Sequence, residues 1–213
     1  MSAVITENLS IHLNNTSIID NLNTSVTSGE KVVITGDSGT GKTTFLNALL
    51  GFVPFSATKM LLLEQELTKD TIHEIRRRTA FLPQEISFSI GRAKDIFFEP
   101  FTFKHNKANQ PSKERILDIF SYLNLSHSAY EKNFEELSGG QKQRILLASV
   151  FLLNKDLILL DEPTKGLDES TIPKVIDLFF KETDKTIIAS SHHPTWIERS
   201  DKIINIEDYA PNH

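Results

Sequence analysis

Residues 36–44 limit what this chain can fold into more than any other stretch. They read Gly36, Asp37, Ser38, Gly39, Thr40, Gly41, Lys42, Thr43 and Thr44. Two glycines bracket four residues and precede Lys and Thr, which is the pattern of a loop that binds phosphates. Glycine lets the backbone approach a polyphosphate where a Cβ would clash, and the loop N–H groups then attract the anion. We expect Lys42 to reach the outer phosphates and the Thr43 hydroxyl to bind Mg²⁺.

The residues on both sides of this loop suit a strand–loop–helix arrangement. Residues 31–35 read as a short buried strand, and residues 45–50 as a helix with an apolar stripe. The helix adds the positive end of its dipole to the anion site. The alternative, a chance glycine-rich turn, does not explain these flanks.

Composition excludes several classes of protein. The formal net charge of −5 argues against nucleic acid as the main partner. The chain has no cysteine, which excludes disulfides, thiolate metal sites and a Cys nucleophile. We expect no signal peptide, because no basic segment precedes an apolar run at the start. No apolar run approaches the ~18 residues of a membrane-spanning helix, so another polypeptide would have to cross a membrane.

Strands alternate with helices along most of the chain, which predicts an α/β fold with a mainly parallel sheet. Residues 85–136 contain helical patterns without intervening strands, so we expect an inserted helical subdomain there. We expect strands over residues 4–13, 18–26, 31–35, 60–64, 80–82, 157–160, 186–190 and 202–206, and helices over 45–50, 71–78, 111–123, 140–153 and 172–180.

A second motif follows the apolar run at residues 157–160. Asp161 and Glu162 come directly after it, at the strand end where open α/β sheets bind ligands. Asp161 is then placed to hold Mg²⁺, directly or through water. Glu162 can face an attacking water as a general base, which contributes typically ~10²–10⁴-fold in rate. The alternative is a polar strand end that caps a neighbouring helix.

A third motif lies at the start of the helix expected near residue 140. It consists of Ser138, Gly139, Gly140 and Gln141, preceded by Leu137. A glycine pair and a hydroxyl at a helix N-terminus form a second anion-binding end. Because the loop at residues 36–44 already holds this chain's nucleotide, the second site suggests a nucleotide held by another copy. The alternative is a plain Ser N-cap.

The order of these motifs resembles that of an ATP-binding cassette (ABC) ATPase over nearly the whole chain. The residues that carry the resemblance are the phosphate loop, Gln84, residues 137–141, residues 157–162, Asp168 and His192. The resemblance implies a P-loop NTPase with an N-terminal antiparallel β subdomain. It also implies one ABC ATPase domain over residues 1–213, with the core and β subdomain at 1–84 and 155–213 and the helical signature subdomain at 85–154.

The resemblance also implies roles for residues that are ambiguous on their own. Gln84 would touch Mg²⁺ and the attacking water, His192 would contact the γ-phosphate, and Asp168 would lie at a dimer interface. Without the family, Gln84 could be a surface amide in a turn, Asp168 a helix N-cap, and His192 a structural residue beside His193. The sequence departs from the family at Leu13, where an aromatic residue usually stacks the adenine.

The resemblance further implies partners. Two copies would sandwich two ATP molecules head to tail, and an integral membrane permease would bind through the region from Gln84 to Phe103. Five phenylalanines gather there: Phe88, Phe97, Phe98, Phe101 and Phe103. They could equally form the core of the small subdomain. The three consecutive arginines at 76–78 read as a solvated helix face rather than a lipid contact.

The function expected from these features is Mg²⁺-dependent hydrolysis of ATP that powers a transporter from the cytoplasmic face of a membrane. One alternative is a soluble ABC ATPase in an assembly or scaffold complex. Another is a small-molecule kinase on a phosphate-loop scaffold, which residues 137–141 disfavour.

Overall fold

The computed structural model describes residues 1–85, 91–104, 106–181 and 184–211, and these divide into two units. The first unit contains Met1–Gln84, Lys155–Glu162 and Asp184–His213; the second contains Glu85–Asn154 and Pro163–Thr183. The family resemblance assigns residues 163–183 to the core, whereas in the structure they belong to the helical unit. The reason is packing of α6 (Ile172–Phe180) on α5 (Gly139–Leu152), where the rings of Phe151 and Phe179 lie 5.9 Å apart.

A parallel sheet forms the centre of the first unit. Within the described residues it has five strands, and every neighbouring pair runs parallel. In spatial order they are β6 (Thr79–Leu82), β7 (Leu157–Asp161), β8 (Thr186–Ser190), β3 (Lys31–Thr35) and β9 (Lys202–Asn205). The continuous apolar runs of β3, β7 and β8 follow from burial on both faces. The carboxyl ends of all these strands therefore meet at one edge, as the sequence predicted.

A second, antiparallel sheet confirms the expected β subdomain. In the described chain its strands are β2 (Thr16–Thr27), β1 (Ser2–Leu13), β4 (Lys59–Leu62) and β5 (Gln65–Glu66), in that spatial order. The strand expected over residues 60–64 ends earlier, because the chain turns at Leu63 and Glu64, which have φ values of 50° and 69°. Burial of the Leu63 side chain holds this turn without the glycine that such a turn normally uses.

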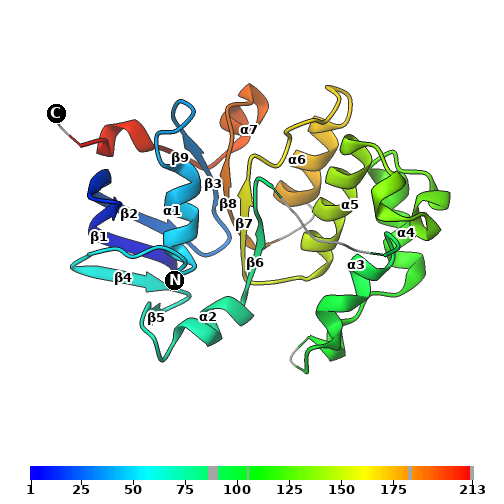
Figure 1. Ribbon diagram of the computed structural model, residues 1–213, viewed down its shortest axis with the longest axis horizontal. Coiled ribbons are helices and arrows are strands. Elements are labelled where there is room, and N and C mark those ends of the chain that lie inside the picture. Colours follow the sequence, from blue (N-terminus) through cyan, green and yellow to red (C-terminus); the bar gives the residue numbers. More distant parts are fainter. Residues whose placement is uncertain (86–90, 105, 182–183, 212–213) are drawn as a thin grey trace. The chain divides into compact units, whose positions relative to one another are not determined.

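Helix α1 (Lys42–Leu49) lies between the two sheets of the first unit, as Figure 1 shows. Its apolar side chains Phe45, Leu46 and Leu49 belong to one buried cluster with residues of both sheets. The helix begins three residues before the expected position, because Gly41 provides an N-cap in the left-handed conformation. The unit also contains α2 (Ile72–Arg77), α7 (Pro194–Arg199) and the 3₁₀ helix η5 (Ile206–Tyr209).

The second unit is helical and has its own aromatic core. Phe97 and Phe101 are buried, and the Phe97 ring lies 5.6 Å from that of Phe120. Phe98 is half-buried, Phe103 is 67% exposed, and Phe88 lies outside the described residues. Two of the four described phenylalanines, Phe97 and Phe101, therefore belong to the core. Besides α5 and α6, the unit contains α3 (Asp95–Phe98), α4 (Lys113–Tyr122), and the 3₁₀ helices η1 (Glu99–Thr102), η2 (Lys107–Asn109), η3 (His127–Glu131) and η4 (Phe134–Glu136).

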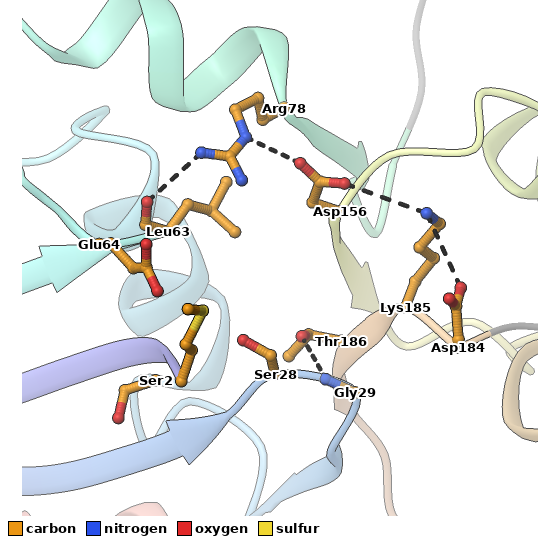
Figure 2. A pocket seen from close by; sticks show the side chains of 11 residues that line it. Ser2, Ser28, Gly29, Leu63, Glu64, Arg78, Asp156, Asp184, Lys185 and Thr186 are labelled. Carbon is orange, nitrogen blue, oxygen red and sulfur yellow. Dashed lines mark hydrogen bonds and ion pairs between the residues drawn. The ribbon is translucent and has the colours of Figure 1, made fainter.

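A pocket of about 270 Å³ opens where β7 and β8 begin, at the end of these strands opposite to Asp161. Figure 2 shows Asp156 between Arg78, whose Nε lies 2.7 Å from the carboxylate, and Lys185, at 4.0 Å. These partly exposed pairs contribute about 0–1 kcal/mol each. Asp156 and Asp184 at this edge therefore each have a cationic neighbour.

Among the residues that the structure describes, no helix is long and apolar enough to cross a membrane.

Candidate active site

The loop between β3 and α1 has the backbone that its glycines predict. Gly36, Gly39 and Gly41 have φ values of 135°, 85° and 108°, which side-chain-bearing residues rarely adopt. A Cβ on Gly36 would lie 2.7 Å from Cγ2 of Ile206, and one on Gly41 would lie 2.9 Å from Cγ2 of Ile18. Glycine is therefore required at both positions by conformation and by space.

A comparison of two alanine variants separates these two causes. Gly39 has no neighbouring atom within 4 Å of the position that a Cβ would occupy, so Gly39→Ala meets only the conformational penalty of about 1–2 kcal/mol. Gly36→Ala must also displace Ile206, so we expect a larger loss of unfolding free energy and weaker ATP binding. Urea unfolding and ATP titration measure both effects. Equal losses in the two variants would contradict the role given to packing at Gly36.

Lys42 is held inside the loop. Its Nζ donates to the carbonyl oxygens of Gly36 at 2.6 Å and Asp37 at 2.8 Å, and the side chain is buried. The Thr40 hydroxyl donates to the Asp37 carbonyl at 2.8 Å. These bonds hold the ammonium group within the curve of the loop.

Asp161 is the centre of a buried hydrogen-bond chain. Thr43 Oγ1 donates to Asp161 Oδ2 at 2.7 Å, and Ser190 Oγ donates to Asp161 Oδ1 at 2.6 Å. The N–H of Glu162 donates to the same Ser190 oxygen at 2.9 Å. A hydroxyl and a carboxylate side by side are hard oxygen ligands of the kind that Mg²⁺ prefers. Thr43 and Asp161 therefore fit the ion predicted from the sequence.

Glu162, which belongs to this hydrogen-bond network through its N–H, lies next to His192. His192 Nε2 is 3.3 Å from Glu162 Oε1, and Glu162 itself has a φ of 49°. Both residues line a cavity of about 150 Å³, together with Gln84 and the phosphate loop. The structure thus brings together predicted residues that follow the ends of four strands, β3, β6, β7 and β8. The lining residues are Ser38, Gly39, Gly41, Lys42, Thr43, Thr44, Gln84, Glu162 and His192.

The predicted signature, Ser138 to Gln141, belongs to the second unit. Ser138 Oγ accepts the Gln141 N–H at 3.3 Å, and Gln141 Oε1 accepts the Ser138 N–H at 3.0 Å. This reciprocal pair is a capping box for α5. The plain serine N-cap, which is the alternative interpretation of these residues, is therefore present. Apart from its chain neighbours and its own helix backbone, no atom lies within 4 Å of the position that a Cβ on Gly139 would occupy, so there is open space on that side of the residue.

Two other predicted positions also have local structural roles. The hydroxyls of Ser170 and Thr171 donate to Asp168 Oδ1 at 2.5 and 2.8 Å, and these bonds lower the pKa of Asp168. Asp168 thereby orders the turn before α6. His193 is the N-cap of α7, because its Nδ1 accepts the Thr195 N–H at 3.2 Å.

The structure adds two residues that the sequence did not single out. One is Ser190, described above. The other is Glu207 in η5, whose Oε1 accepts the Asp37 N–H at 2.6 Å. Ser190 could have been found, because parallel pairing of β7 and β8 places it opposite Asp161. Glu207 has no comparable sequence signal. Leu13 packs against the apolar core of the first unit and offers only an aliphatic surface.

Comparison with known proteins decides the family. The profile described as ABC transporter matches residues 19–165. The chain belongs to the ABC transporter family. It carries the ATPase domain of that family, in agreement with the resemblance seen in the sequence.

Individual ABC relatives match most of this chain. The transport/processing ATP-binding protein MesD of Leuconostoc mesenteroides is 32% identical over 89% of the chain, which spans 27% of MesD. The probable iron export ATP-binding protein FetA of Escherichia coli K12 is 32% identical, with 91% of this chain and 86% of FetA covered. The ABC cassette MJ0796, in a dimeric post-hydrolysis state with ADP and Pi, has a TM-score of 0.82 and 26% identity, covering 95% and 94% of the two chains.

Proposed function

We propose that this ABC domain hydrolyses ATP at the site around Lys42 and that two copies acting together power a transporter. One observation carries the proposal: Glu162 and His192 line the same cavity as the phosphate loop, and Thr43, which also lines it, donates to Asp161. Acid–base groups and phosphate-binding groups are therefore within reach of a single triphosphate.

Each residue has a distinct part in the proposed reaction. Lys42 and the N–H groups of residues 36–44 bind the phosphates. Thr43, Asp161 and Gln84 would hold Mg²⁺, which neutralises charge on the phosphates when bound. Glu162 accepts a proton from the attacking water as general base. His192, 3.3 Å from Glu162, orients that carboxylate and faces the γ-phosphate.

We further propose that the site is completed by a second copy. In this arrangement Ser138, Gly139, Gly140 and Gln141 of one copy contact the ATP held by the other. The open space beside Gly139 and the N-terminus of the 14-residue α5 support this role. The relative MJ0796 forms a dimer, which is the same kind of assembly. ATP binding would close the dimer and hydrolysis would reopen it.

The transport role rests on relatives and on an exposed aromatic side chain. MesD and FetA are both named for transport. We place the contact with an integral membrane permease in the region from Gln84 to Phe103, at the cytoplasmic face, because Phe103 exposes a large apolar ring there.

Purification of the tagged full chain from detergent-solubilised membranes of its own cells tests the transport role. We expect a multi-span membrane protein to co-purify in fixed proportion, and Phe103→Asp to reduce its recovery several-fold. Phe52→Asp is the matched control, since Phe52 is 56% exposed in the first unit, where Arg76 stacks on it at 4.6 Å. An active ATPase found only with soluble proteins would instead support an assembly or scaffold role.

A further inference from the structure

We infer that Ser190 is a positioning residue for ATP hydrolysis, because its hydroxyl ties the Asp161 carboxylate to the backbone of Glu162. The inference rests on the function proposed above and adds a residue to that site. It comes from three side chains on three elements: Thr43 on α1, Asp161 on β7 and Ser190 on β8.

The hydroxyl of Ser190 has the bonding capacity that this role requires. A serine hydroxyl has one hydrogen to donate and two lone pairs to accept. Ser190 donates to Asp161 Oδ1 at 2.6 Å and accepts the Glu162 N–H at 2.9 Å. One side chain therefore fixes both neighbouring residues of the carboxylate motif.

The position of Glu162 depends on the hydrogen bond from its N–H to Ser190 Oγ. Its φ of 49° is a conformation that residues other than glycine rarely adopt. The bond to Ser190 holds the Glu162 N–H in that geometry, and the side chain then lies 3.3 Å from His192. Without an acceptor, the backbone can relax and move the carboxylate. A displacement of about 1 Å in a catalytic group can lower a rate on the order of 10²-fold.

The orientation of the Asp161 carboxylate also depends on Ser190. Ser190 holds Oδ1 and Thr43 holds Oδ2, so the carboxylate has one defined rotation. Asp161 and Ser190 are 1% and 0% exposed, so bulk water is not available to replace a lost hydroxyl. Loss of Ser190 Oγ would remove one of the two bonds that fix the carboxylate. The carboxylate could then rotate, which would change the positions of the oxygen ligands that Thr43 and Asp161 offer to Mg²⁺.

A second buried hydroxyl on β8, that of Thr186, provides a matched control for the possibility that Ser190 is important only for stability. Thr186 lies four residues before Ser190, and its buried Oγ1 accepts the Gly29 N–H at 3.0 Å, as Figure 2 shows. Thr186→Val removes this hydroxyl at the end of the strand away from Asp161. It should reduce stability without changing hydrolysis.

Steady-state kinetics of three variants test the inference. We expect Ser190→Ala to lower kcat about 10- to 100-fold with KM for ATP changed less than about threefold, because positioning rather than binding is lost. Ser190→Thr keeps the hydroxyl and should recover most of kcat. Thr186→Val should keep both constants. Thermal unfolding of each variant separates kinetic effects from loss of fold.

A second measurement avoids turnover. In a Glu162→Gln background, calorimetry gives the affinity for ATP with Mg²⁺ and with EDTA. We expect Ser190→Ala to reduce the gain in affinity from Mg²⁺, and Thr186→Val to leave that gain unchanged. If Ser190→Ala does not fold, Ser190→Cys, whose thiol is a weak hydrogen-bonding group, takes its place in both assays.

The outcomes are distinguishable. A wild-type chain that hydrolyses ATP, with Ser190→Ala matching it in kcat and in Mg²⁺ dependence, would overturn the inference and leave the proposed function standing. An equal loss of kcat in Thr186→Val and Ser190→Ala would also overturn it. Removal of either buried hydroxyl on β8 would then lower kcat, and the effect would not be specific to Ser190. A wild-type chain that binds ATP but never releases phosphate would overturn the proposed function itself.

Discussion

We expect Glu162→Gln to lower the rate of ATP hydrolysis by about 10²–10⁴-fold and to leave ATP binding intact. The amide has nearly the size and shape of the carboxylate but cannot accept a proton from water. Glutamine also preserves the backbone N–H that donates to Ser190, so the strand end should not rearrange. Phosphate release under single-turnover conditions measures the rate, and calorimetry measures the affinity.

The same variant tests the proposed dimer. Because ATP binding persists without hydrolysis, the closed two-copy state should accumulate and elute as a dimer in size-exclusion chromatography with ATP and Mg²⁺. Glu198→Gln, an exposed carboxylate of α7, is the control and should hydrolyse ATP at the wild-type rate. Hydrolysis by Glu162→Gln at the parent rate would show that Glu162 is not the base.

Lys42→Ala should weaken ATP binding itself, by about 10- to 100-fold, because a hydrogen bond to a charged group contributes about 1.5–3 kcal/mol. The buried ammonium group is the cation that the structure holds within the loop. The variant also removes the bonds to the carbonyls of Gly36 and Asp37, so the loop should lose order. Titration with a fluorescent ATP analogue measures the affinity.

A second substitution at this position separates charge from packing. Lys42→Met keeps most of the buried stem but has no charge. We expect it to restore the unfolding temperature lost in Lys42→Ala while leaving ATP binding weak. Unchanged affinity in either variant would refute the assigned role of Lys42. Recovery of affinity in Lys42→Met would show that the stem, not the ammonium group, supports binding.

Much of this fold follows from local patterns. The apolar runs before Asp161 and before the phosphate loop predict buried parallel strands, and both strands are present. The glycines of residues 36–44 predict positive φ angles, which the structure shows. Element ends were less predictable. The β4–β5 turn has Leu63 and Glu64 at positions of positive φ, where a glycine would have indicated a turn in the sequence. The reason for the reversal, burial of the Leu63 side chain, is visible only in the structure.

Local sequence patterns are enough to predict which chemical groups stand at the strand ends, because strand periodicity and glycine spacing are properties of neighbouring residues. They therefore predict Lys42, Thr43, Asp161 and Glu162 as candidates, and the resemblance to the ABC family adds His192. Only the tertiary structure decided which of them touch. The 3.3 Å contact of His192 with Glu162 and the bonds of Ser190 and Glu207 join residues 28 to 170 positions apart. Such contacts depend on strand order and register. They join residues that are distant in the sequence, so no local sequence pattern predicts them.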